Sequence, residues 1–174
     1  MTDIPVIETE RLRLRAPIKA DFDAYAAMWA DERVTAYIGG KPRTRNESWL
    51  RFIGMHGLWA LTGYGYWLFT DRQTDTLVGV GGLANFERGI DLLTGYPEAG
   101  WAIAPDFWGR GLVSEAMAAV MAWNDRSLGG NEVRCIIDPG HAASEHVAAK
   151  LGFVPIGDAL LGDATVNVYS RAGR

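Results

Sequence analysis

The stretch "APDFWGRGLVSEAMAAVMAW", residues 104–123, places two glycines around an arginine directly ahead of a helical pattern. The first turn of a helix leaves backbone N–H groups without partners, and the helix dipole adds partial positive charge there. An anion such as phosphate is therefore stabilised at that end, and glycines let it approach the backbone closely. This feature predicts a phosphate-binding turn between a strand and a helix. The alternative is an ordinary tight turn capped by Asp106.

Strand and helix patterns alternate along the rest of the chain, which indicates an α/β class. Six segments have strand patterns: 11–16, 66–70, 76–83, 98–104, 132–138 and 165–170. Helical spacing of apolar residues follows Lys19, Thr44, Gly111 and His141. Thr44 and Glu47 match a capping box at the start of the second helix, and Gly152 is expected as a left-handed cap at the end of the last one.

Length and composition limit the classes of protein to consider. The chain has 174 residues, 48% of them hydrophobic, so we expect one domain over residues 1–174. The formal net charge is −4 with no long basic run, so nucleic acid is not an expected partner. No apolar run approaches the ~20 residues of a spanning helix, so no membrane association is expected. With one cysteine and no signal-peptide pattern, a cytoplasmic location is expected, as a monomer or a homodimer.

Several rival motifs lack what their chemistry needs. The glycines of "GVGGLA", residues 79–84, are not followed by a helix, so we expect a bulge or close strand packing rather than a dinucleotide site. Cys135 lies mid-strand among apolar residues and is expected to be a buried core thiol. No metal site is expected, because the lone cysteine and three scattered histidines lack ligand spacing: His56, His141 and His146.

The motif order resembles that of a known family. "ETERLRLRAPIKADFDAYAAMWAD", then "WGRGLVSEA" and "HAASEHVAAKLGF", resemble the GNAT acyl-CoA-dependent N-acetyltransferases, in particular the branch that acetylates ribosomal-protein N-termini. The resemblance covers nearly the whole chain. It implies a central mixed, mostly antiparallel sheet flanked by helices, with two splayed strands that hold the cosubstrate acetyl-CoA. It also implies acetyl transfer to a primary amine by direct attack in a ternary complex, without a metal.

The resemblance also implies which residues bind coenzyme A. The family's phosphate motif falls on Trp108, Gly109, Arg110, Gly111, Leu112 and Val113, followed by the hydroxyl of Ser114. Only Gly111 matches at a prescribed position, and Val113 places branched bulk where glycine or alanine is usual. Arg110 either pairs with phosphate or is solvated. The pantetheine arm is expected along the preceding strand, where a backbone N–H near Ile103 stabilises the developing oxyanion.

Two side chains are candidates for proton transfer. An attacking amine is mostly protonated at pH 7, and Glu98 is the candidate that takes its proton; the alternative is a solvated glutamate at a strand edge. The family's usual tyrosine falls on Ala148. In the resembled branch an N-x-x-S segment opens this helix, and its serine falls on Ser144 and its asparagine on His141. Ser144 is therefore the candidate acid for the leaving thiolate; the alternative is a helix-start residue only.

The acceptor is left open by the sequence. A protein N-terminus, a polyamine, an amino sugar and an amino acid all remain, as does a non-catalytic acyl-CoA-binding protein with the same fold. Residues 30–65 and the loop 85–98 are expected beside the acceptor. Acidic side chains in that loop indicate attraction of a cationic amine: Glu87, Asp91 and Glu98.

Overall fold

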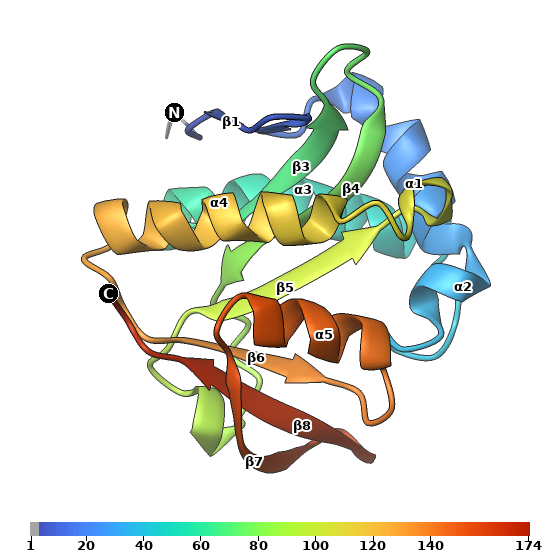
Figure 1. Cartoon of the computed structure of the whole chain (residues 1–174). Helices are drawn as coiled ribbons and strands as arrows, with labels where there is room; N and C mark the ends of the chain where they lie inside the picture. The colour runs from blue at the N-terminus through green and yellow to red at the C-terminus, as the bar shows by residue number, and fades with distance from the viewer. Residues whose placement is uncertain (1–3) are drawn as a thin grey trace.

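One mixed sheet runs through residues 4–174, the part of the chain that the computed structural model describes. Its strand order is β1-β2-β3-β4-β5-β6-β8-β7 (Figure 1). The strands are β1 (Ile7–Glu8), β2 (Leu12–Arg15), β3 (Tyr66–Asp71), β4 (Leu77–Ala84), β5 (Glu98–Ile103), β6 (Val133–Ile137), β7 (Val154–Leu161) and β8 (Ala164–Arg171). The helices are α1 (Phe22–Ala30), α2 (Glu32–Thr35), α3 (Arg45–Thr62), α4 (Leu112–Ser127) and α5 (Ala142–Lys150), with short 3-10 turns at Lys19–Asp21, Asp91–Leu93 and Pro105–Phe107.

Local sequence signals account for the helix ends. Thr44 caps α3, and its side chain and that of Glu47 form the predicted capping box. α3 ends at Gly63, whose φ of +77° closes the helix in the left-handed conformation. Gly152 has a φ of +88° directly after α5, as predicted. The caps fix where each helix enters and leaves the sheet.

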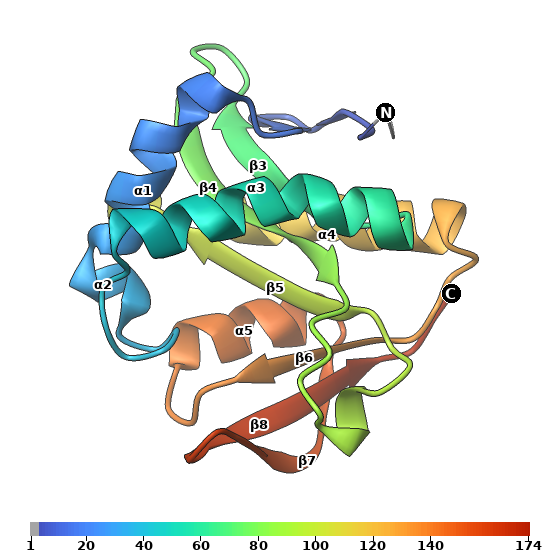
Figure 2. The same cartoon turned by 180° about the vertical axis from the view of Figure 1, so that it is seen from behind.

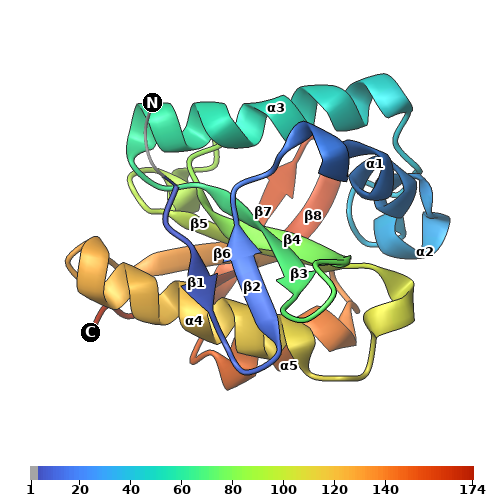
Figure 3. The ribbon, with the colours of Figure 1, turned by 90° about the horizontal axis from the view of Figure 1, so that it is seen from above.

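Helices cover both faces of the sheet. Figure 2 shows α1 and α3 in front of β3, β4 and β5, and the view from above places α4 on the opposite face (Figure 3). The face beneath α1 and α3 buries one apolar cluster that includes Tyr25, Phe52, Leu68, Val80 and Ala102. The face beneath α4 buries a larger one that includes Trp67, Phe69, Met117, Val120 and Ile103. Neighbouring residues of β5 thus contact opposite layers, as the period of a strand requires.

The sheet opens between β5 and β6. β5 pairs with β4 along its whole length, whereas its parallel pairing with β6 consists of one register position, Glu98 opposite Arg134. From Glu98 onward the two strands diverge, as Figure 1 shows. This is the predicted pair of splayed strands, and the mixed, mostly antiparallel sheet with flanking helices is confirmed.

Three elements were not predicted. β1 has two residues, α2 has four, and β7 is an edge strand whose residues are mostly exposed. β7 contains Pro155 and Gly157, with a register shift between them, so it lacks the alternation that marks a half-buried strand. The predicted glycine packing in 79–84 is confirmed, because a Cβ on Gly81 would lie 2.7 Å from the Gly100 carbonyl oxygen. Among the helices of residues 4–174, none combines the length and apolar character needed to cross a bilayer.

Candidate active site

A groove of about 730 Å³ lies where β5 and β6 separate. Its lining comes from both predicted acceptor regions: Tyr37, Arg43 and Leu50 from residues 30–65, and Phe86 and Arg88 from the loop before β5. Residues of β5 form one side, and the start of α5 closes the other. The groove therefore gives access to β5 from the face that α1 and α3 cover.

The free edge of β5 presents backbone donors to this opening. The Ala104 N–H donates to the Val78 carbonyl oxygen at 2.9 Å. Because N–H groups alternate along an antiparallel ladder, those of Trp101 and Ile103 point to the opposite edge, toward β6. The Ile103 carbonyl oxygen accepts a bond of 2.8 Å from the indole Nε1 of Trp108. The Ile103 N–H is thus placed where an oxyanion donor is predicted, although its role stays a prediction.

The glycine loop meets α4 with its first-turn amides uncovered. Gly109 and Gly111 have φ angles of +74° and +73°, and Gly111 is the N-cap of α4 with no side-chain cap. Asp106 does not cap this helix, so the predicted cap of the alternative tight turn is wrong. A Cβ on Gly109 would meet nothing within 4 Å, and one on Gly111 only the Arg11 Nη2 at 3.9 Å. The loop therefore leaves room for an anion beside the N–H groups of Leu112 to Ser114.

Some side chains of the loop are buried in the core, and others are exposed to solvent. Leu112 is buried, and Val113 packs against the same core cluster, so its bulk is partly buried there. Trp108 and Arg110 are exposed, and the Arg110 guanidinium lies 5.4 Å from the ring centroid of Phe107. Ser114 is half-buried in the first turn of α4.

Arg11, the residue before β2, holds this loop in place, a role that sequence reasoning missed. Its Nη1 donates to the Arg110 carbonyl oxygen at 2.9 Å, and its Nε donates to Glu115 at 2.7 Å. The Glu115 carboxylate also accepts from the Thr9 hydroxyl at 2.6 Å. These bonds join segments about a hundred residues apart, so no local pattern marks them.

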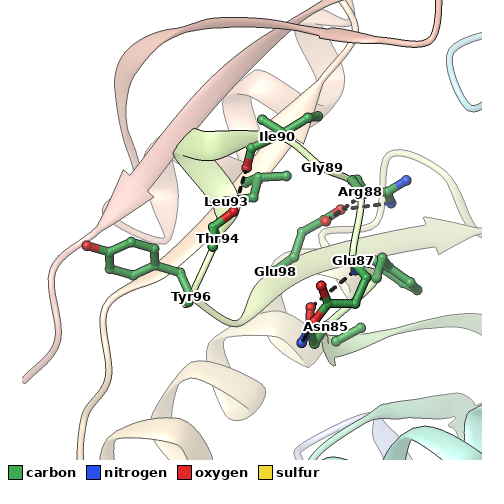
Figure 4. A pocket seen from close by; sticks show the side chains of 12 residues that line it. Asn85, Glu87, Arg88, Gly89, Ile90, Leu93, Thr94, Tyr96 and Glu98 are labelled. Carbon is green, nitrogen blue, oxygen red and sulfur yellow. Dashed lines mark hydrogen bonds and ion pairs between the residues drawn. The ribbon is translucent and has the colours of Figure 1, made fainter.

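Glu98 is buried and paired. The residue is 5% exposed, which excludes the alternative of a solvated strand-edge residue. Arg88 donates through Nε at 2.7 Å and through Nη2 at 2.9 Å to the two carboxylate oxygens (Figure 4). Glu98 lines the groove and also a smaller cavity under residues 84–96. Sequence reasoning found Glu98 but missed Arg88.

Tyr66 brings a second polar group to β5. A Cβ on Gly100 would overlap the Tyr66 hydroxyl, so this glycine is required by close approach. Burial, together with the charge of Glu98, raises the pKa of Tyr66, so its hydroxyl is neutral at neutral pH. Both residues line the groove. Tyr66 thus places an uncharged hydroxyl against the strand that carries the oxyanion donor.

The start of α5 carries the predicted pair. Ser144 and His141 both line the groove, with 3.4 Å between the serine Oγ and the histidine Nε2. The His141 ring stacks on Tyr37 with centroids 4.5 Å apart. Burial lowers the pKa of His141, against the opposing charges of Asp138 and Glu145, so the imidazole is neutral at pH 7. His141 is the N-cap of α5 but makes no side-chain capping bond.

The charge of the groove differs from the sequence-based expectation. Of the three acidic residues expected to attract a cation, only Glu98 lines it, and Arg88 neutralises that carboxylate. The arginines of the lining outnumber its carboxylates: Arg43, Arg51 and Arg88 against Glu98 and Asp138. The expectation of an acidic acceptor side is therefore wrong. Cys135 is 1% exposed and burial raises its pKa, which confirms the prediction of a core thiol.

Comparison with known proteins agrees with this geometry. A family model described as an acetyltransferase (GNAT) domain matches residues 11–154. YoaA, an uncharacterised N-acetyltransferase of Bacillus subtilis, is 27% identical over 153 residues, 86% of this chain and 82% of that protein. The crystal structure of an acetyltransferase from Agrobacterium tumefaciens superposes with a TM-score of 0.85 at 28% identity, covering 97% of this chain and 95% of that one.

The fold is also that of a ribosomal-protein acetyltransferase. RimL, a ribosomal L7/L12 α-N-protein acetyltransferase solved with coenzyme A, superposes with a TM-score of 0.78 at 19% identity, over 97% of this chain and 98% of that one. The chain is therefore an acetyltransferase of the GNAT family.

Proposed function

We propose that this enzyme transfers an acetyl group from acetyl-CoA to a primary amine by direct attack within a ternary complex. The observation that carries the proposal is the separation of β5 from β6 beyond Glu98. The glycine loop lies at the end of β5 on one side of this opening, and the groove opens on the other. Donor and acceptor thus reach the same strand edge by different routes.

The donor side is built from backbone. The N–H groups of the α4 first turn, with the open glycines and the Ser114 hydroxyl, supply donors for the diphosphate of coenzyme A. Leu112 anchors the turn in the core, and the exposed Arg110 is available to a phosphate. The free edge of β5 pairs with the pantetheine arm, and the Ile103 N–H stabilises the oxyanion as the amine attacks the thioester carbonyl.

The proton of the amine needs a route out of the site. An α-amino group has a pKa of about 8 and a lysine side chain one of about 10.4, so either is mostly protonated at pH 7. In the proposal Glu98 relays this proton. Arg88 is a positioning residue for it, since it holds both carboxylate oxygens, and a proton on Glu98 displaces one of those hydrogen bonds.

The leaving group needs only a weak donor. A thiol has a pKa of about 8.5, so its thiolate leaves with modest assistance near neutral pH. In the proposal the Ser144 hydroxyl donates to it. His141, with its neutral imidazole, is a hydrogen-bond partner of that hydroxyl or a contact of the pantetheine arm.

A screen of amines for acetyl-CoA-dependent release of free thiol tests the proposal. The panel contains peptide N-termini, polyamines, amino sugars and amino acids. Thiol release that requires an amine, with the acetylated amine found by mass spectrometry, is the expected result. Coenzyme A binding without turnover across the whole panel would contradict it and favour the non-catalytic alternative.

A further inference from the structure

One arginine of the groove is partly buried and has a guanidinium nitrogen with no hydrogen-bond partner among residues 4–174. Arg43 lies in the segment before α3, and its Nη1 is buried with no hydrogen-bond partner. Its guanidinium carbon lies 3.8 Å from the ring centroid of Trp29, while its backbone N–H donates to the Trp29 carbonyl oxygen at 2.9 Å. The loop and the ring thus hold the cation in place at the wall of the groove.

A second arginine adds positive charge to the same groove. Arg51, on α3, lines the same groove and is exposed to solvent. Burial first, and then the like charge of Arg51, lower the pKa of Arg43 to about 10, so Arg43 remains positively charged at neutral pH. Within residues 4–174 neither arginine forms an ion pair.

Two carboxylates that could neutralise this pair are occupied elsewhere. Glu98 is held by Arg88 through both oxygens. Glu47 accepts from the backbone N–H and the hydroxyl of Thr44, in the capping box of α3. The buried Nη1 of Arg43 is costly without a partner, and a ligand with negative charge would remove that cost, with the exposed Arg51 as a second cation beside it.

The position of the pair separates it from the phosphate loop. Tyr25 and Trp29, beside Arg43, belong to the cluster beneath α1 and α3. Leu112, at the phosphate loop, belongs to the cluster beneath α4 on the other face of the sheet (Figure 3). The two arginines therefore lie on the acceptor side of the sheet. Exposed Tyr37 and Leu50 add apolar surface there, and the volume of the groove suits a small molecule.

We propose that the acetyl acceptor is a small amine with an apolar body and an anionic group, a carboxylate or a phosphate, which Arg43 and Arg51 bind. This inference rests on the function proposed above and narrows its substrate class. Arginine presents a planar fork of donors that matches such oxyanions. The anion binds near Arg43 and directs the amine toward β5.

Matched acceptors that differ in charge test this inference. Leucine, phenylalanine and methionine are each compared with their amides and with their aminophosphonate analogues, at saturating acetyl-CoA. For the wild-type enzyme, the KM of the anionic member is expected to be lower than that of the amide by roughly 10-fold or more. This ratio corresponds to the free energy of one hydrogen bond to a charged group. A preference for carboxylate over phosphonate, or the reverse, identifies the anion.

Variants assign the effect to the two arginines. Arg43→Gln and Arg51→Gln are expected to raise the KM for the anionic acceptor by roughly 10- to 100-fold, with kcat within about threefold and the amide unaffected. Arg43→Lys keeps the positive charge at this position. Arg51→Gln alters an exposed side chain, so this variant is expected to fold even if Arg43→Gln does not. Arg45→Gln is the control, because Arg45 is exposed and pairs with Asp23 outside the groove.

A binding measurement gives a second result that does not depend on turnover. Calorimetry with the coenzyme A-saturated enzyme is expected to show tighter binding of the amino carboxylates or aminophosphonates than of the amides, with the difference lost in Arg43→Gln. Equal affinity for charged and neutral members, or a difference that survives both substitutions, overturns the inference. Amine-dependent thiol release with no charge preference leaves the proposed function standing and removes this inference alone. Anion binding without any turnover removes the proposed function and keeps Arg43 as an anion site.

Discussion

Arg88 determines how Glu98 is able to act. If Glu98 relays the proton of the amine, Glu98→Gln is expected to reduce kcat by roughly 100-fold near neutral pH, with partial recovery at higher pH as free amine becomes abundant. Arg88→Gln is expected to reduce kcat as well, because the carboxylate loses the two charged hydrogen bonds that position it. Rate measurements across pH on folded variants test this. An unchanged wild-type profile in Glu98→Gln would remove Glu98 as the relay.

Ser144 is expected to contribute to the rate without being essential. Loss of one neutral donor removes about 1–3 kcal/mol of transition-state stabilisation, so Ser144→Ala is expected to lower kcat by roughly 5- to 150-fold. Affinity for coenzyme A stays within about threefold, because the bond forms as charge develops on sulfur. Turnover and melting temperature are measured on one preparation. A variant with lower stability, by about 1 kcal/mol, and an intact kcat would show a helix-start residue only.

Single residues of the site differ in how far the sequence reveals them. Glu98 and Ser144 were found because motifs locate them on a strand head and a helix start. Arg88 and Arg43 belong to no sequence motif. Arg88 matters because it pairs with the buried carboxylate of Glu98, and Arg43 because its buried Nη1 has no hydrogen-bond partner within residues 4–174. Burial and long-range pairing are tertiary properties, so no pattern of neighbouring residues specifies them.

At the scale of elements, the start of α4 carries the binding of coenzyme A. Gly111→Val is expected to weaken this binding strongly, because the loss of two charged hydrogen bonds costs roughly 3–6 kcal/mol. Calorimetry with coenzyme A on folded protein measures the effect. Gly152→Val is the matched control, since Gly152 has a φ of +88°, open space around it and a place after α5, outside the loop. If the control variant lost as much affinity for coenzyme A as Gly111→Val, the two glycines of the loop would serve backbone conformation alone.

Elements with strong local signals were predicted well. α3 has a capping box and a glycine stop, and β4 has an apolar run with glycines where neighbouring strands approach closely. β7 escaped prediction because an exposed edge strand buries little and needs no alternation. Its partner β8, with Val166 and Val168 buried, was found. Prediction thus succeeded where an element buries one face.

For the whole molecule, arginine–carboxylate pairs join distant segments. Arg171 on β8 donates to both oxygens of Asp125 on α4, at 3.0 and 2.7 Å, and these bonds lower the pKa of Asp125 despite its burial. A carboxyl group with a lowered pKa contributes stability above its unfolded value near 3.9, and this stability is lost as pH falls through the folded value.

Acid unfolding measures that contribution. Arg171→Gln is expected to reduce the free energy of unfolding by roughly 1–3 kcal/mol at pH 7. The difference from the wild type is expected to shrink as pH falls below about 4 and to vanish only below the lowered folded pKa of Asp125, where this carboxyl group is protonated in both folded proteins. Urea denaturation at pH 7 and near pH 3 provides the comparison. A difference that is independent of pH would mean that packing of the Arg171 side chain, rather than the pair, stabilises the fold.

The mixed, mostly antiparallel sheet and its pair of splayed strands came from the family resemblance, not from strand and helix patterns, and the strand order was not predicted. Hydrophobic period identifies elements, but it does not specify which strands are neighbours or where a pair diverges. The charge of the groove could not be predicted from the sequence for the same reason, because it depends on which segments lie side by side. The loop 85–98 contains acidic residues, yet the structure brings arginines from α3 and from the segment before it to the same space.

Two-substrate initial-rate kinetics test the central claim, that donor and acceptor meet directly at β5. Direct attack requires both substrates bound at once, and the buried thiol of Cys135 is not placed to carry an acetyl group. Rates measured over a grid of acetyl-CoA and acceptor concentrations are expected to give intersecting double-reciprocal lines, with no acetyl label retained on the protein when the amine is absent. Parallel lines together with a labelled protein would show a covalent acetyl-enzyme and would contradict the account.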